Sequence, residues 1–380
     1  MHKINRGALS CAAFLFSASL AFSSNPPIVE NYYGPSCVVI SDINKDGKAD
    51  LIIADRGTNK VYIYLGNGDG TYQTPITYVT GAAANQVAIA DFNGDGKLDL
   101  AVTNSYANTF SNLFGHGDGT FNAPISYATL NNPFSVIAVD FNKDGLTDIA
   151  VSNFNSNAVQ VFMNAGGGRF RAPVSYTTNM PLDMSYGDFN GDGFIDIVAS
   201  NRQSGTVSVF FGNGDGTFKP QFTIPIVTTF IQSNPSLALA IDFNHDGKLD
   251  IVVGDEHNYN IVVLLGNGDG TFRKPITFPT GGAFPFSLAV ADFNGDGILD
   301  VVAGAKLSNA MAVMLGAGAG LLKPSTLYPV DNTPFYTSVG DLNGDGIVDV
   351  VTVNNVSSTV SILIGNGDGT FKPSYSFPVQ

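Results

Sequence analysis

The sequence predicts an all-β protein, a seven-bladed β-propeller with four antiparallel strands in each blade. The nine-residue pattern D-x-N-x-D-G-x-x-D begins at Asp42, Asp91, Asp140, Asp188, Asp242, Asp292 and Asp341, at intervals of 48 to 54 residues. Short runs rich in Val, Ile, Ala, Tyr and Phe recur between turn residues, which is typical of strands. Four such runs in each repeat, with a period of about 50 residues, indicate a propeller.

The second repeat shows the order of the elements. "QVAIA" (86–90) precedes the aspartate pattern, "LDLAV" (98–102) follows it, "TFSNLF" (109–114) comes next, and "PISYATL" (124–130) ends the repeat. We call the nine-residue segment the aspartate loop. The turn between the third and fourth strands, "GHGDGT" in this repeat, is the glycine turn. All seven repeats follow this order, and such repeats bury their faces against their neighbours.

Residues 1–23 predict a signal peptide that is cleaved. Basic residues Lys3 and Arg6 precede the apolar run 8–22, and small residues follow it. The run is about 15 residues, whereas a membrane span needs about 20. We therefore expect residues 24–380 to be secreted, periplasmic or at the cell surface, with no membrane span. Removing the leader removes Cys11, and we expect Cys37 to be a buried, unpaired residue.

The remainder divides into seven repeats. Their expected bounds are near 34–80, 81–130, 131–178, 179–230, 231–280, 281–330 and 331–380. The segment "IVENYY" (28–33) resembles an additional fourth strand, which could pair with the last blade and close the ring.

The aspartate loops predict calcium sites. Calcium takes six to eight oxygen ligands, and in helix–loop–helix sites positions 1, 3, 5 and 7 supply oxygens around a glycine at position 6. The alternative is a simple hairpin turn, because Asp, Asn and Gly favour turns. A turn does not need three carboxylates in every copy. By contrast, the glycine turn lacks its aspartate in the third and sixth repeats ("NAGGGR", "GAGAGL"), so we interpret it as a backbone turn.

The charge balance agrees with metal sites. The loops hold 21 of the 32 acidic residues, and the formal net charge is −14, or −16 without Lys3 and Arg6. Seven Ca²⁺ ions would bring the net charge to about −2. With 18 Lys and Arg and no basic run, nucleic acid is a poor candidate partner.

These repeats resemble the FG-GAP/VCBS repeat family, the calcium-binding propeller repeat also found in integrin α-subunit heads. The resemblance rests on the aspartate loops and on turns such as "GNGDGTF". It implies a seven-bladed propeller with about seven Ca²⁺ ions, held by loop positions 1, 3, 5 and 9 and by the backbone carbonyl of position 7. The implied ligands are Asp42, Asn44, Asp46, Lys48, Asp50; Asp91, Asn93, Asp95, Lys97, Asp99; Asp140, Asn142, Asp144, Leu146, Asp148; Asp188, Asn190, Asp192, Phe194, Asp196; Asp242, Asn244, Asp246, Lys248, Asp250; Asp292, Asn294, Asp296, Ile298, Asp300; and Asp341, Asn343, Asp345, Ile347, Asp349.

The family is functionally broad, so the ligand must be sought elsewhere. Loops between the second and third strands, and those leading into each first strand, should share the edge opposite the aspartate loops; we call this edge the loop face. Variable loops on a rigid scaffold commonly bind ligands. The candidates are Arg56, Tyr106, Arg202, Glu256, His257, Tyr259, Phe286 and Tyr336.

Two function classes remain open. The first is a monomeric binding or adhesion module for a protein or a surface glycan. The alternative is a polysaccharide lyase or hydrolase on a propeller scaffold. The sequence has no G-x-S-x-G or H-E-x-x-H motif, and Glu256-His257 is the only acid/base-like pair outside the aspartate loops.

Overall fold

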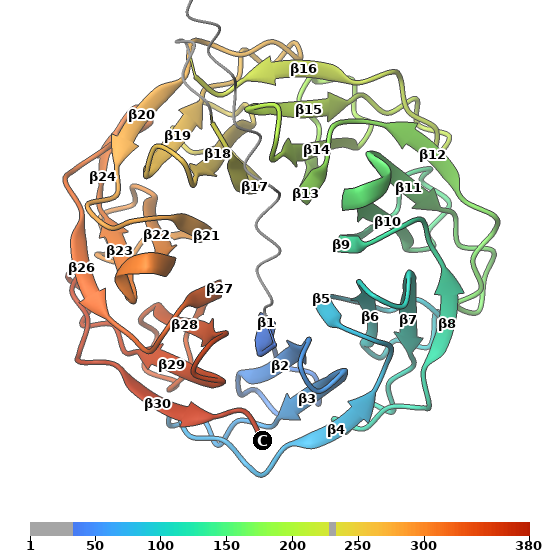
Figure 1. Ribbon diagram of the computed structural model, residues 1–380, viewed down its shortest axis with the longest axis horizontal. Coiled ribbons are helices and arrows are strands. Elements are labelled where there is room, and N and C mark those ends of the chain that lie inside the picture. Colours follow the sequence, from blue (N-terminus) through green and yellow to red (C-terminus); the bar gives the residue numbers. More distant parts are fainter. Residues whose placement is uncertain (1–32, 228–232) are drawn as a thin grey trace, which may run out of the picture. The chain divides into compact units, whose positions relative to one another are not determined.

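The computed structural model describes residues 33–227 and 233–380, in which seven four-stranded antiparallel sheets stand like blades around a central axis (Figure 1). Contacts divide the chain into Met1–Asn31 and Tyr32–Gln380, and the blades belong to the second unit. The predicted fold class is therefore confirmed. The predicted signal peptide 1–23 lies outside the described residues, as does the possible closing strand 28–33 apart from Tyr33.

Within each blade the first strand lies nearest the axis and the fourth lies at the outer rim (Figure 1). The first strands are β1 (Pro35–Ser41), β5 (Ala84–Ala90), β9 (Pro133–Val139), β13 (Pro181–Gly187), β17 (Pro235–Ile241), β21 (Pro285–Ala291) and β27 (Pro334–Gly340). The second strands are β2 (Asp50–Asp55), β6 (Asp99–Asn104), β10 (Asp148–Asn153), β14 (Asp196–Asn201), β18 (Asp250–Asp255), β22 (Asp300–Ala305) and β28 (Asp349–Asn354).

The third and fourth strands complete each sheet. The third strands are β3 (Lys60–Tyr64), β7 (Thr109–Leu113), β11 (Ala158–Phe162), β15 (Thr206–Phe210), β19 (Asn260–Leu264), β23 (Ala310–Met314) and β29 (Thr359–Leu363). The fourth strands are β4 (Ile76–Val79), β8 (Ile125–Ala128), β12 (Val174–Thr177), β16 (Phe222–Pro225), β20 (Ile276–Pro279), β26 (Thr326–Pro329) and β30 (Tyr375–Pro378). A short pair, β24 (Gly316–Gly318) and β25 (Leu321–Leu322), forms the sixth glycine turn.

Helix is nearly absent from the described part of the chain. It contains the 3-10 turns η1 (Phe154–Ser156) and η2 (Lys306–Ser308). No helix among these residues is long and apolar enough to cross a membrane.

The second strands are the most buried elements, because a neighbouring blade covers each of their faces. In β2, "DLIIAD", all six residues are buried, and the other six second strands repeat this pattern. The fourth strands contain no buried residue: β4 and β20 alternate between half-buried and exposed residues, and each of the other five has one half-buried residue. A fully buried strand therefore marks the middle of a blade, and a largely exposed strand marks its rim.

The hydrophobic core lies between blades. One cluster joins Ile52 and Ile63 of the first blade to Leu100 and Leu113 of the second. Cys37 belongs to the same cluster and is fully buried, as predicted, and burial raises the pKa of its thiol to about 12. Each blade thus contributes both faces to the core, which is how a chain of this length avoids a single large core.

The ring closes by packing the seventh blade against the first. The Ser338 hydroxyl donates a hydrogen bond to the carbonyl of Val38 (2.7 Å), and the Asn355 amide donates to the carbonyl of Pro35 (3.0 Å). Within the described residues every blade is formed by one continuous stretch of the chain, and β30 already occupies the fourth position of the last blade. Closure among these residues therefore rests on side-by-side packing.

Candidate metal loops and binding face

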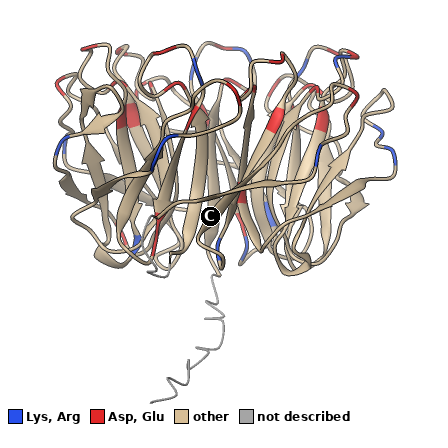
Figure 2. Ribbon diagram, turned by 90° about the horizontal axis from the view of Figure 1, so that it is seen from above, with Lys and Arg blue, Asp and Glu red and all other residues tan. Residues whose placement is uncertain are grey.

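The aspartate loops and the glycine turns lie together at one edge of the ring. Figure 2 shows acidic residues concentrated along this edge. In each blade the two segments meet through the position 9 aspartate, as between Asp50 and the backbone N–H of Gly66 (2.8 Å).

The position 9 aspartate begins the second strand and is fully buried in every blade. Its Oδ2 accepts the backbone N–H of loop position 2, and its Oδ1 accepts a backbone N–H at the start of the glycine turn, at 2.6–3.1 Å. These pairs recur for Asp50, Asp99, Asp148, Asp196, Asp250, Asp300 and Asp349. The residue therefore fastens the loop to the turn, a role that the sequence did not reveal.

Burial raises the pKa of the position 9 carboxyl in every loop. For Asp148 and Asp196 the pKa rises to about 6, mainly because burial penalises the charged form, although two backbone N–H groups oppose the rise. The carboxylates at positions 5 and 1, such as Asp144 and Asp140, raise it further. The acidic side chains of one loop therefore repel one another.

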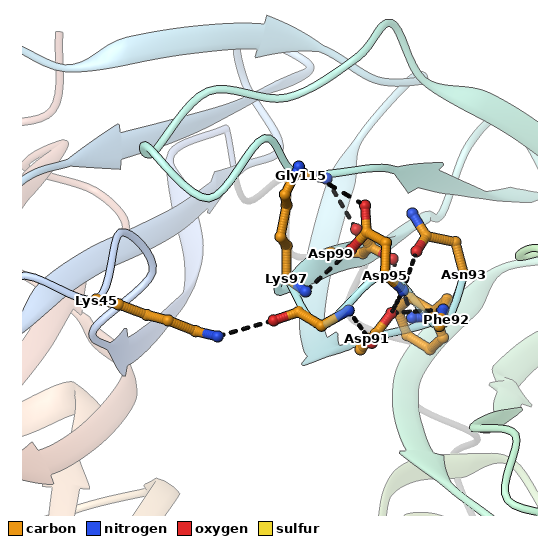
Figure 3. Close-up of polar contacts among 10 residues, drawn as sticks. Lys45, Asp91, Phe92, Asn93, Asp95, Lys97, Asp99 and Gly115 are labelled. Carbon is orange, nitrogen blue, oxygen red and sulfur yellow. Dashed lines mark hydrogen bonds and ion pairs between the residues drawn. The ribbon is translucent and has the colours of Figure 1, made fainter.

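The exposed part of each loop is folded around its own side chains, as the second copy shows (Figure 3). Asp91 Oδ2 accepts the N–H of Gly96 (2.7 Å), Asn93 Oδ1 accepts that of Asp95 (2.8 Å), and Asp95 Oδ1 accepts that of Lys97 (2.9 Å). The other six loops repeat all three bonds. Lys45 of the first loop also donates to the carbonyl of Gly96 (2.8 Å), which links neighbouring loops.

Position 6 needs glycine because of its backbone conformation. Gly96 has a φ of 78°, and the other six lie between 79° and 83°, a left-handed region that disfavours side chains. A Cβ at Gly96 would meet no atom within 4 Å, so conformation and not crowding sets the requirement.

The chemistry of these loops fits a hard cation, because the proposed side-chain ligands are the carboxylate oxygens of Asp and the amide oxygen of Asn. In the described residues, however, no group of three or more His, Cys, Asp or Glu side chains is placed to hold a metal ion. The carboxylate oxygens instead accept the loop's own N–H groups. The predicted set at positions 1, 3, 5, 7 and 9 therefore fits Ca²⁺ in chemistry but does not form a ready-made cluster.

Several loop-face candidates form pairs between adjacent blades. The Arg56 guanidinium lies over the Tyr106 ring at 5.5 Å, and Tyr106 is 58% exposed. Arg202 forms a 2.7 Å ion pair with Glu256, whose side chain is fully buried. His257 and Tyr259 are exposed on the same loop as Glu256.

The assignment of two residues, Phe286 and Tyr336, to the loop face is wrong. Phe286 is 3% exposed and packs on Phe335 with ring centroids 4.3 Å apart. Tyr336 is half-buried toward the axis, where its hydroxyl accepts a hydrogen bond from Gln86 Nε2 (3.0 Å). Burial raises the pKa of Tyr336 well above its ordinary value. Both residues face inward because β21 and β27 begin at Pro285 and Pro334, earlier than the sequence indicated.

Comparison with known protein families shows which family the chain belongs to. FG-GAP-like repeats match residues 42–102, 91–151, 140–199, 188–253, 242–303 and 341–379. The chain belongs to the FG-GAP repeat family. Each match begins at an aspartate loop, so the resemblance drawn from those loops is confirmed. The stretch 304–340 between the last two matches contains the sixth glycine turn, "GAGAGL", which departs from the pattern.

Solved structures with a similar fold include propellers of different activity. An Agrocybe aegerita lectin that recognises non-reducing terminal N-acetylglucosamine has a TM-score of 0.58 and 22% identity, over 90% of this chain and 94% of that chain. A periplasmic gluconolactonase from Pseudomonas aeruginosa has a TM-score of 0.62 and 16% identity, over 79% and 86%. Virginiamycin B lyase from Staphylococcus aureus has a TM-score of 0.55 and 15% identity, over 89% and 94%. At these identities the likeness concerns the fold alone, and no curated protein matches the sequence.

Proposed function

We propose that this FG-GAP propeller is an exported, monomeric, calcium-stabilised module that binds a protein or a surface glycan through its loop face. The observation that carries the proposal is the contrast between the two edges of the ring. All seven aspartate loops repeat the same hydrogen bonds, whereas the loop face differs from blade to blade. Uniform loops suit a scaffold, and variable loops on a rigid scaffold suit recognition.

Calcium belongs to the scaffold in this proposal. The side chains of positions 1, 3, 5 and 9 and the carbonyl of position 7 would hold one ion per blade. When bound, Ca²⁺ supplies positive charge that offsets the repulsion among three carboxylates. The pKa of the position 9 carboxyls supports this role: burial is the main cause of its rise, and the carboxylates at positions 5 and 1 raise it further.

Export is supported by the order of residues 1–23, in which basic residues precede an apolar run and small residues. The ligand class draws on the fold relatives. One is the lectin, and another is BBS1N, solved in complex with ARL6DN, with a TM-score of 0.58 and 13% identity over 84% of this chain and 89% of that chain. Those ligands belong to those proteins, but they illustrate that this architecture accommodates both glycans and proteins.

The enzymatic alternative is less well supported. Glu256 and His257 were the candidate acid/base pair, but the Glu256 carboxylate is buried in its ion pair with Arg202. A general acid or base must reach the proton that it transfers. A carboxylate that is fully buried and held by a guanidinium is better suited to joining the fourth and fifth blades.

A combined glycan and protein array, probed with Ca²⁺ and again with chelator, tests the proposal. We expect a ligand whose binding weakens when Tyr106 and Tyr259 are replaced by Ala. Val79→Ala is the matched control, because Val79 is 63% exposed but lies on the outer strand β4. Turnover of a polysaccharide by the purified protein would contradict the proposal. Array binding that stays unchanged when both tyrosines are replaced would contradict it too.

A further inference from the structure

The junction between the seventh and first blades contains an aromatic groove. Tyr64, Tyr72 and Gln73 of the first blade border two adjoining hollows of about 310 and 500 Å³. Tyr375 and Phe377 of β30 line the smaller hollow, and Thr74 lines the larger one. We call these six residues the seam groove. Both hollows fall in the size range of about 300–1,000 Å³ that is usual for small-molecule sites.

The other blades serve as internal controls, because the groove residues differ from their equivalents there. Tyr72 pairs with Gly66 in an isolated bridge, and the same bridge in other blades uses Phe121, Phe170, Phe218, Phe272 and Phe371, with Leu322 in the sixth. Tyr375 begins β30, where the other fourth strands begin with Ile76, Ile125, Val174, Phe222, Ile276 and Thr326. Repeat packing therefore does not require tyrosine at either position.

The Tyr72 hydroxyl is buried and has no hydrogen-bond partner among the described residues. At two other junctions a fourth-strand tyrosine accepts the N–H of the next blade's turn, as Tyr78 does from Phe121 (2.8 Å). At the seam this tyrosine is replaced by Phe377, and the Tyr375 hydroxyl donates to the carbonyl of Gly70 (2.6 Å) instead. A buried hydroxyl without a partner is costly, so a ligand that reaches it through a small movement of the surrounding side chains would gain a hydrogen bond.

The side chains of the groove are also uncharged. Gln73 follows Tyr72, whereas the equivalent residues of the last five blades are Arg171, Lys219, Arg273, Lys323 and Lys372. Neither hollow is lined by an acidic or basic side chain. The ligand should therefore be uncharged.

We propose that the seam groove binds a neutral saccharide. A sugar ring presents an apolar face, which suits the Tyr375 ring, 40% exposed, together with hydroxyls that both donate and accept. The Tyr72 and Thr74 hydroxyls and the Gln73 amide likewise both donate and accept. A proline-rich peptide also fits aromatic grooves but offers only carbonyl acceptors. This site lies apart from the loop face and rests on the proposed function only in assuming that the chain is a binding module.

The test measures binding of chitotriose, cellotriose, mannotriose and maltotriose by calorimetry, with trigalacturonate and decaproline as competing classes. We expect at least one neutral trisaccharide to bind. Tyr72→Phe should weaken it about tenfold, which is about 1.4 kcal/mol, without lowering the melting temperature, because five other blades carry phenylalanine there. Tyr375→Ala and Gln73→Lys should weaken it as well.

The matched control is Ile125→Ala, which should leave trisaccharide affinity unchanged. Ile125 is 45% exposed and begins the fourth strand of the second blade, the position that Tyr375 holds in the seventh. Failure of all four neutral sugars to bind, or equal affinity in the Tyr72→Phe protein, would overturn the proposal. Preferential binding of decaproline or trigalacturonate would overturn it too. An array ligand lost only in the loop-face variants would leave the proposed function standing while the groove proposal fails.

Discussion

The Asp99 carboxylate accepts a hydrogen bond from the backbone N–H of Gly115 at 2.8 Å and so joins the second aspartate loop to its glycine turn. Its second oxygen accepts the N–H of Phe92 at 2.9 Å. Both N–H groups are therefore satisfied inside the protein by one buried side chain. This arrangement recurs in all seven blades, so position 9 stabilises the fold independently of any ion.

Replacing Asp99 by Ala should destabilise the protein even in chelator. Two buried N–H groups lose their acceptor, and each unsatisfied group costs about 1–3 kcal/mol. We expect a loss of at least about 2 kcal/mol in the free energy of unfolding, measured by urea titration in EDTA. The control is Asp118→Ala, because Asp118 is an exposed acceptor for the N–H of Thr120 within the glycine turn. Equal losses in the two variants would contradict the structural role of Asp99.

Calcium stoichiometry should distinguish the loop from the turn. Asp95→Ala removes a proposed ligand at position 5, so the bound Ca²⁺ measured by elemental analysis should fall by one ion per chain. Asp118→Ala should leave the number unchanged, because the turn holds no proposed ligand. If both variants lose an ion, the assignment of calcium to the aspartate loop alone is wrong.

The melting temperature should rise with millimolar Ca²⁺ and fall with EDTA. Ions that bind only the folded state stabilise it by mass action, and extracellular calcium modules often bind at about 10⁻⁴–10⁻³ M. Scanning calorimetry over a Ca²⁺ series measures the shift, with Mg²⁺ as the control ion. A melting temperature that changes with neither Ca²⁺ nor EDTA would show that calcium does not stabilise the scaffold.

The sequence predicted the blades well because its signals are local and repeated. The aspartate loops, the buried second strands and the glycine turns are each set by residues within one repeat. Phe286 and Tyr336 were assigned to the loop face because the first strands start about two residues earlier than the second repeat indicated. Register shifts lie next to Pro285 and Pro334. Proline begins six of the seven first strands, and this signal marks the boundary that the second repeat, which begins with Ala84, does not show.

The contacts between the seventh and first blades could not be predicted from the residues of a single repeat. Tyr72 and Tyr375 are about 300 residues apart in the sequence, and each looks like an ordinary substitution within its own repeat. Only the packing of the seventh blade on the first brings them to one groove. An alignment of the seven repeats with one another would have marked Tyr72, Gln73 and Tyr375 as exceptions, but not their proximity.

The loop around Glu256 should separate stability from recognition. Glu256→Ala removes the carboxylate that pairs with Arg202 and should cost about 3 kcal/mol, because breaking a buried ion pair leaves a charge poorly compensated. His257→Ala and Tyr259→Ala change exposed side chains and should each cost less than about 0.5 kcal/mol. Urea titration of the three variants measures the difference. A Glu256→Ala protein of unchanged stability would show that the pair contributes nothing to the fold.

Asp183 should make stability depend on pH. This carboxyl is buried near the axis, where Gln86 Nε2 donates to it (3.1 Å), and burial raises its pKa to about 6. Its pKa in the unfolded chain is about 3.9, so the folded state binds more protons between these values. The stabilising contribution of the protonated acid is complete below about pH 4 and is lost as the pH rises through about 6.

Asp183→Asn has the charge of the protonated acid at every pH, and the aspartate loops contribute equally to both proteins. From pH 4 to pH 7, the unfolding free energy of the wild type should therefore fall relative to that of the variant by about 2–3 kcal/mol. Urea titrations of both proteins in chelator measure this difference, and parallel curves would mean that Asp183 titrates normally in the folded protein.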